Sequence, residues 1–204
     1  MSIHNKIREW ETGPGIRLMR EVGIEPHSRV LDLGCGFGHY AVAVQSLLGQ
    51  NGHLIALDKN KRVLKHFSSR NDNSHHIEYQ AVDLADLDPA WVRMADYILL
   101  YDMIHASWDR FAFLAFLKRH MSKQCVLSIL PFHLSNFRNS QGKKARYIYK
   151  KIIDEMDDLG FVLRKEIRDK GIHFEKYHSP TIMARGDLTF DDLERGRILN
   201  FSLK

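Results

Sequence analysis

Three glycines at alternate positions follow a carboxylate near the start of the chain, in Asp32-Leu33-Gly34-Cys35-Gly36-Phe37-Gly38. Glycine lets the backbone turn sharply and lets a ligand approach the main chain without meeting a Cβ atom. The Asp32 carboxylate would repel a pyrophosphate and suits a ligand with a positive group. Asp58 follows at the spacing from which acidic residues accept hydrogen bonds from ribose hydroxyls.

The elements that position these residues can be predicted from apolar patterning. A buried strand over 29–33 precedes the glycines, and a helix follows over 39–49. Further strands over 53–57, 76–81 and 95–101 each end near a carboxylate or a histidine. Ligands in open α/β sheets bind outside the carboxyl ends of the strands, so we expect the chemistry at that edge.

Two other uses of a glycine turn fit less well. A phosphate-binding loop of the G-x-x-x-x-G-K-[ST] kind needs a lysine and a hydroxyl that this stretch lacks. The dinucleotide fingerprint G-x-G-x-x-G needs a third glycine at His39, whereas the glycine falls one residue earlier, at Gly38. A pyridine-nucleotide dehydrogenase is therefore a distant alternative.

The pattern Asp-x-Gly-x-Gly-x-Gly at 32–38 resembles the first motif of class I S-adenosylmethionine-dependent methyltransferases. The resemblance implies S-adenosyl-L-methionine as cofactor and S-adenosyl-L-homocysteine as product. It implies that Asp58 holds the ribose hydroxyls, that Asp83 accepts from the adenine amino group, and that the Leu84 backbone N–H meets a ring nitrogen. The cofactor-binding residues predicted on this basis are Asp32, Gly34, Gly36, Gly38, Asp58, Lys59, Asp83, Leu84 and Tyr101.

Two points of this assignment stay open. Asp86 and Asp88 lie close enough to Asp83 to leave the register of the adenine contact uncertain. The stretch 95–105 resembles the fourth motif of a subgroup that includes quinone-biosynthesis and arsenite methyltransferases, and arsenite would require cysteines near the site. The quinone-biosynthesis type, which acts on small molecules, is the subgroup that we favour.

A methyl acceptor that must lose a proton needs a general base. The resemblance places Tyr101 against the sulfonium and His105 toward the acceptor space. The predicted catalytic residues are His105, Tyr101 and His133, with His173 as a further candidate base. No group of cysteines, histidines and carboxylates has the spacing of a metal site, so we expect no metal.

Composition limits the class of protein. The chain has 204 residues, a formal charge of +5 and two cysteines, which suits a globular domain in a reducing cytoplasm. No apolar run is long enough for a membrane span, and the polar N-terminus lacks a signal-peptide core. The mild basicity permits RNA binding, for which the basic helix 143–151 is the candidate surface.

The expected fold is a doubly wound α/β domain over 1–204, with a mostly parallel seven-stranded sheet and helices on both faces. The family inserts its last strand, here 197–203, antiparallel between the fifth strand, 124–130, and the sixth, 161–167. Residues 1–27 form a helical N-terminal cap in this prediction. The long segment 168–196 must then lie over the active-site face, because both strands that flank it reach that edge.

Methyl transfer to an O, N or C atom of a small molecule by in-line displacement is the leading hypothesis. An RNA methyltransferase is the second, because of the basic helix 143–151. A protein that binds S-adenosylmethionine without turnover is the alternative from a different class. The sequence leaves the acceptor and the oligomeric state undetermined.

Overall fold

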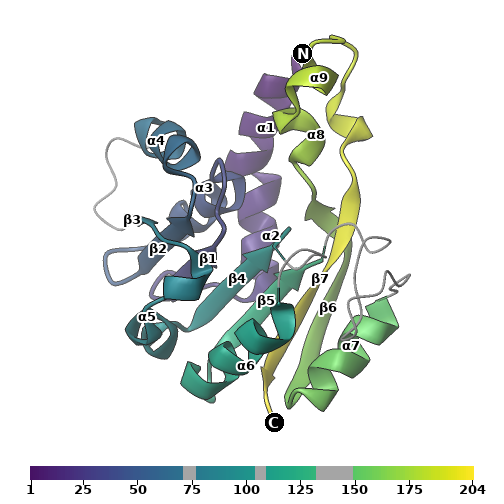
Figure 1. The fold of residues 1–204 in the computed structure, drawn as a ribbon. Coiled ribbons are helices and arrows are strands. Elements are labelled where there is room, and N and C mark those ends of the chain that lie inside the picture. The colour runs from purple at the N-terminus through teal and green to yellow at the C-terminus, as the bar shows by residue number, and fades with distance from the viewer. Residues whose placement is uncertain (71–76, 104–108, 132–148) are drawn as a thin grey trace.

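The computed structural model describes residues 1–70, 77–103, 109–131 and 149–204, which contain a seven-stranded sheet (Figure 1). The strand order is β3-β2-β1-β4-β5-β7-β6, and β7 is antiparallel to both neighbours while β1 to β5 are parallel. The predicted fold class and the predicted insertion of the last strand are therefore confirmed. The strands are β1 (Arg29–Leu33), β2 (His53–Asp58), β3 (Ile77–Ala81), β4 (Tyr97–Tyr101), β5 (Val126–Leu130), β6 (Phe161–Ile172) and β7 (Arg195–Leu203).

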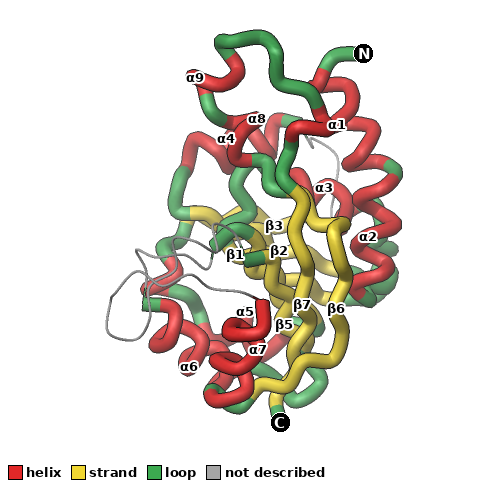
Figure 2. Tube along the Cα trace, turned by 90° about the vertical axis from the view of Figure 1, so that its right-hand side faces the viewer, coloured by secondary structure: helices red, strands yellow, loops and turns green. Residues whose placement is uncertain are grey.

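Helices cover both faces of the sheet (Figure 2). One face packs on α1 (Ile3–Thr12), α2 (Pro14–Val22), α3 (His39–Gln45) and Phe67 of α4 (Lys61–Ser69). The other face packs on α5 (Pro89–Met94), α6 (Arg110–His120) and α7 (Tyr149–Asp158). No helix in the four described ranges is long and apolar enough to cross a membrane.

Alternation along the strands explains why the core has two halves. Successive strand residues point to opposite faces, and in β1 Val30 joins one apolar cluster while Leu31 and Leu33 join the other. All three side chains are at most 2% exposed. Asp32 lies on the same face as Val30, so its carboxylate points toward the α1–α3 side of the sheet.

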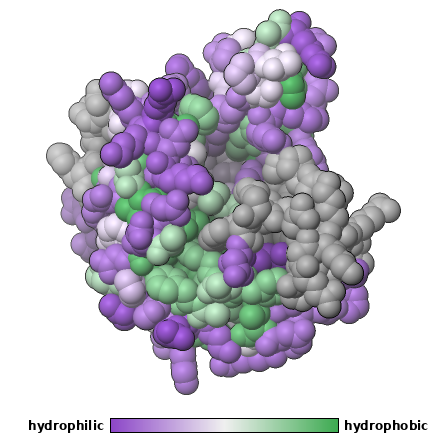
Figure 3. Space-filling view, viewed as in Figure 1, coloured by the Kyte–Doolittle hydropathy of each residue, from purple (hydrophilic) through white to green (hydrophobic). Residues whose placement is uncertain are grey.

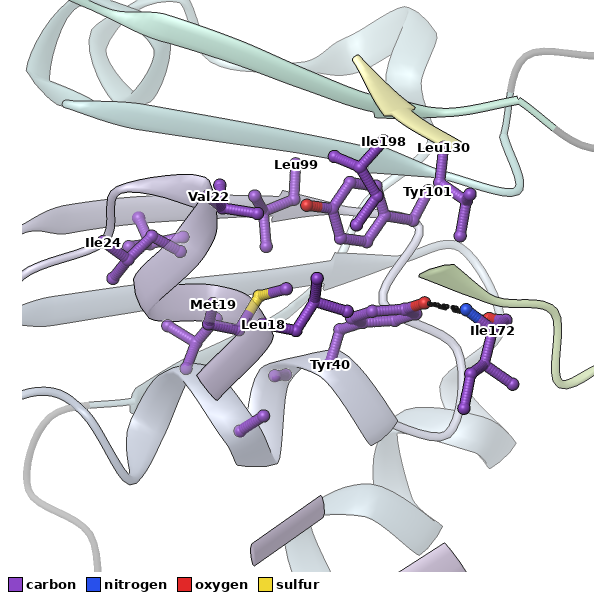
Figure 4. Close-up of a cluster of buried hydrophobic side chains, with 14 of the residues drawn as sticks. Leu18, Met19, Val22, Ile24, Tyr40, Leu99, Tyr101, Leu130, Ile172 and Ile198 are labelled. Carbon is purple, nitrogen blue, oxygen red and sulfur yellow. Dashed lines mark hydrogen bonds between the residues drawn. The ribbon is translucent and has the colours of Figure 1, made fainter. Parts of the chain in front are cut away.

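A tyrosine ties α3 to the far end of β6. The Tyr40 hydroxyl donates to the Ile172 carbonyl at 3.0 Å and accepts from the Ile172 N–H at 2.7 Å. Figure 4 shows this contact beside Tyr101, whose ring meets that of Tyr40 edge-on at 4.6 Å. These two hydrogen bonds of the Tyr40 hydroxyl fix the point at which the chain leaves β6, above the carboxyl edge of the sheet.

The β6–β7 hairpin is longer than the sequence predicted. Strand β6 continues to Ile172 past a register shift after Ile167, and Gly171 pairs with Gly196. The polar run at 168–170 concealed this extension, because both of its faces are exposed and carry no alternation. The connection contains two unpredicted helices, α8 (Glu175–His178) and α9 (Pro180–Met183). A 3₁₀ turn, Phe190–Asp192, follows them before β7 begins.

Candidate active site

The glycine turn adopts backbone angles that favour glycine. Gly34, Gly36 and Gly38 have φ values of +74°, +53° and +80°, in the left-handed region. A Cβ at Gly38 would lie 2.3 Å from the Phe67 ring, so packing also demands glycine there. A Cβ at Gly36 would meet no atom of the described residues within 4 Å and would project into open space. Gly36 is thus the point where a ligand can approach the main chain.

Two cavities share this turn, and both are lined by Gly34 and Gly36. The one beside the end of β2, here the β2 cavity, measures about 430 Å³. The one beside the end of β4, the β4 cavity, measures about 370 Å³. Both lie at the carboxyl edge of the parallel strands, where α/β sheets bind ligands.

Besides Gly34 and Gly36, the β2 cavity brings together four further predicted residues, Asp58, Lys59, Asp83 and Leu84. Asp58 accepts from the Gly36 N–H at 3.0 Å and from the Asn60 N–H at 2.8 Å, so its carboxylate is fixed against the glycine turn. Asp83 accepts from the Ala85 N–H at 3.2 Å. A carboxylate has about four lone-pair sites, so both retain acceptor capacity for a ligand's hydroxyl or amino hydrogens.

Asp32 is an unpaired carboxylate in the wall of the β4 cavity. Its side chain is 3% exposed, and its Oδ2 atom has no hydrogen-bond partner among the described residues. Burial, followed by the negative charge of Asp58, raises the pKa of Asp32 to about 7. A buried acceptor without a partner is rare. An ammonium group of a ligand would complete it.

Tyr101 and Asp102 line the same cavity at the end of β4. The Tyr101 hydroxyl shares a 2.8 Å hydrogen bond with Ser128, and burial raises the pKa of Tyr101 above its usual range. Such a hydroxyl is a poor proton acceptor at neutral pH, whereas the ring can face a cation. Asp102 has a φ of +59° and lies 2.5 Å from Nδ1 of His173, a buried side chain that does not line the cavity.

A hydrogen-bonded chain of three residues, two buried and the third half-buried, was not predicted from the sequence. Glu11 Oε1 lies 2.6 Å from His39 Nδ1, and His39 Nε2 lies 2.7 Å from His178 Nε2. The His178 ring stacks on Phe37 at 3.8 Å, and both line the β4 cavity. The one available signal was that His39 stands where a dinucleotide site has its third glycine.

Two of the predicted catalytic residues, His105 and His133, lie outside the described residues. The structure brings the predicted cofactor residues to the two cavities, apart from Gly38, which packs on Phe67. Within the described ranges, no group of three or more histidine, cysteine and carboxylate side chains could hold a metal ion.

The site has the features that S-adenosylmethionine requires. The open space at Gly36 lets the ligand lie directly against the main chain. The Asp32 carboxylate, whose Oδ2 has no partner among the described residues, suits the ammonium group of the ligand. Asp58, on the other side of the turn, suits the two ribose hydroxyls.

Comparison with known proteins agrees with this fit. Residues 30–124 match the family described as a methyltransferase domain. A search of curated proteins found no match.

Solved structures share the fold at low sequence identity. A SAM-dependent methyltransferase from Aquifex aeolicus has a TM-score of 0.67 and 14% identity, covering 98% of each chain. Magnesium protoporphyrin IX methyltransferase from Synechocystis PCC 6803 with bound SAM has a TM-score of 0.62 and 13% identity, covering 99% of this chain and 82% of that one. The family match over residues 30–124, the sheet order and the glycine turn agree with an S-adenosylmethionine-dependent methyltransferase, whose cofactor is S-adenosylmethionine and whose product is S-adenosylhomocysteine.

Proposed function

We propose that the chain transfers the methyl group to an O, N or C atom of a small-molecule acceptor bound in the β4 cavity. The observation that supports this is the cavity itself, which adjoins the glycine turn and is covered by Phe174, Glu175 and His178. Its volume of about 370 Å³ lies in the range of roughly 300–1,000 Å³ typical of small-molecule sites.

When bound, S-adenosylmethionine supplies an activated methyl group on a cationic sulfonium. In this proposal Asp32 holds the ammonium group, Asp58 and Lys59 the ribose, and Asp83 and Leu84 the adenine. The Tyr101 ring would lie beside the sulfonium, a contact worth about 0.5–2 kcal/mol. These contacts would hold the methyl group in line with an acceptor atom about 3–3.5 Å away.

The residues that remove a proton from the acceptor belong to the same proposal. Asp102 brings a carboxylate into the β4 cavity, and His173 holds that carboxylate through a 2.5 Å contact. A non-glycine residue in a left-handed conformation is strained, and such strain clusters at functional sites. Asp102 therefore joins His105 and His133 as a candidate base, while the raised pKa of Tyr101 favours a positioning role.

Residues 1–27 and 168–196 would form the walls of the acceptor site within a single domain. The described residues support this because α1 and α8 both contribute to the surface beside the glycine turn. The subgroup of quinone-biosynthesis type remains part of the proposal and rests on the 95–105 pattern alone.

The RNA alternative gains little from the described residues. Lys143, Lys144 and Arg146 lie outside them, and Lys150 pairs with Asp154 at 2.8 Å.

A screen of metabolite and tRNA fractions with radiolabelled S-adenosylmethionine tests the proposed function. We expect label in a metabolite fraction and none in tRNA. Gly36→Ala is the control variant, because its Cβ enters ligand space without a protein clash, and a left-handed alanine costs only about 1–2 kcal/mol. It should remain folded and lose transfer.

The other outcomes of this screen separate the alternatives. Label in tRNA would support the RNA enzyme. Calorimetric binding of S-adenosylmethionine without transfer to any fraction would support a non-catalytic binding protein.

A further inference from the structure

A third cavity of about 550 Å³ lies behind the wall formed by Phe37, His39 and His178. These three residues line both this cavity and the β4 cavity, so the two cavities are direct neighbours. Four separate elements surround it: α1, the glycine turn, α4 and the α8–α9 segment. We call it the α1–α4 cavity. Figure 3 shows the surface hollowed between the lobe of α8 and α9 and the side that carries α4.

The lining of the α1–α4 cavity is rich in arginine and histidine side chains. Arg8 and Arg70 face it with four histidines, His4, His39, His66 and His178, and no carboxylate lines it among the described residues. Lysine and arginine side chains commonly line anion sites, and the planar guanidinium matches a carboxylate or a phosphate with paired hydrogen bonds.

One buried carboxylate lies beneath this lining and is already engaged. Glu11 accepts from Arg70 Nη2 at 2.7 and 2.6 Å and lies 2.6 Å from His39 Nδ1. Burial would raise the pKa of Glu11, but the hydrogen bonds from His39 and Arg70 outweigh it and lower the pKa. Glu11 is thus ionised and balances Arg70. Arg8 is exposed and has no ion pair within the described part of the chain.

The hydrogen bonds of His39 and the lowered pKa of His178 reflect the positive charge around them. An ionised Glu11 makes His39 Nδ1 the donor, so His39 Nε2 accepts from His178 Nε2–H. Burial, and then the charges of His39, His66 and Arg70, lower the pKa of His178 to about 3. His39 and His178 therefore separate the cavities, and on the arginine side Arg8 is a cation without a carboxylate partner among the described residues, because Glu11 is engaged by Arg70.

We propose that the α1–α4 cavity binds an anionic group of the methyl acceptor, a carboxylate or a phosphate, through Arg8 and Arg70. The reacting atom of the same molecule lies in the β4 cavity, on the other side of His178 and Phe37. This inference rests on the proposed function and adds the chemical class of the acceptor: a small acid. Arg70 binds the anion while Glu11 holds its guanidinium in place.

The first test is anion-exchange fractionation of a metabolite extract at pH 7 before the radiolabel screen. The acceptor should be retained with the acids. Transfer only to the unretained fraction would overturn the anion site and leave the proposed function standing. Transfer to no fraction would contradict the proposed function itself. Phosphatase treatment of the active fraction separates the two sources, since only a phosphate ester would lose its activity or its retention.

The second test compares Arg8→Gln with Arg17→Gln, an exposed arginine on α2 outside all three cavities. Arg8→Gln should raise the KM of the retained acceptor about tenfold or more, the loss expected for a charged hydrogen bond. Its affinity for S-adenosylmethionine should match that of the wild type and of Arg17→Gln. An unchanged KM would overturn the assignment. Equal weakening of S-adenosylmethionine binding would place the anion contact on the cofactor and also overturn it.

Discussion

The β2 cavity and the α1–α4 cavity both adjoin the glycine turn and are built in different ways. In the β2 cavity the contacting residues are close in the sequence: Asp58 accepts from backbone N–H groups 22 and 2 residues away. Around the α1–α4 cavity the contacting residues are far apart in the sequence: 59 residues separate Arg70 from Glu11, and 139 separate His39 from His178. Main-chain geometry shapes the first cavity, whereas side chains from separate elements shape the second.

The two sides also differ in charge. Burial raises the pKa of Asp32 to about 7, and burial with neighbouring positive charges lowers the pKa of His178 to about 3. Near neutral pH the cofactor side therefore holds a carboxylate that lacks a cation. The other side holds Arg8, a cation that has no ion pair within the described residues. This difference gives each side a separate experimental signature.

The largest expected effect belongs to Asp32→Asn. Removing one partner of a buried charge pair costs about 2–5 kcal/mol of binding free energy. We expect S-adenosylmethionine affinity to fall by that amount, measured by isothermal calorimetry. The exposed Asp187→Asn on the α9–β7 connection is the matched control and should bind as the wild type does.

Stability separates this loss of binding from unfolding. The Asp32 charge is buried without a partner among the described residues, so its removal should raise the free energy of unfolding at pH 8. Wild-type affinity in Asp32→Asn would show that the ammonium group binds elsewhere.

The comparison also explains what the sequence could predict. Gly34, Gly36 and Asp58 are recognisable because a backbone conformation and a strand end dictate their types and spacing locally. The strands themselves were predictable because each carries its own apolar pattern, whereas the place of the last strand in the sheet came from the family resemblance. Glu11 and His178 carry no such local mark. Only the folded chain shows that they meet through His39.

Asp58→Ala should have the second largest effect. If its carboxylate holds the ribose hydroxyls, the loss should weaken S-adenosylmethionine binding by about 1–3 kcal/mol. Asp58→Asn retains one acceptor oxygen for the Gly36 N–H and should lose less. Asp86→Ala removes an exposed carboxylate that does not line the β2 cavity, and calorimetry should show no change. If Asp86→Ala weakens binding and Asp58→Ala does not, the ribose assignment is wrong.

The smallest effect is a pH dependence that belongs to the cofactor side alone. Because a bound ammonium group favours the ionised carboxylate, affinity should fall below pH 7 by at most about 1.4 kcal/mol per pH unit. The sign for folding is opposite. The folded-state pKa of Asp32 lies above its ordinary value of 3.8, so the folded protein binds more protons between about pH 4 and 7. Stability from this group is therefore full below pH 4 and lost as the pH rises to 7.

Asp32→Asn should remove the contribution of this group to both dependences, and the difference from the wild type can be measured by urea unfolding and calorimetry between pH 5 and 8. His178 does not titrate in this window, because its pKa is lowered to about 3. A pH dependence of unchanged size in Asp32→Asn would have to come entirely from other groups. The charge difference between the two sides of the turn would then not rest on Asp32.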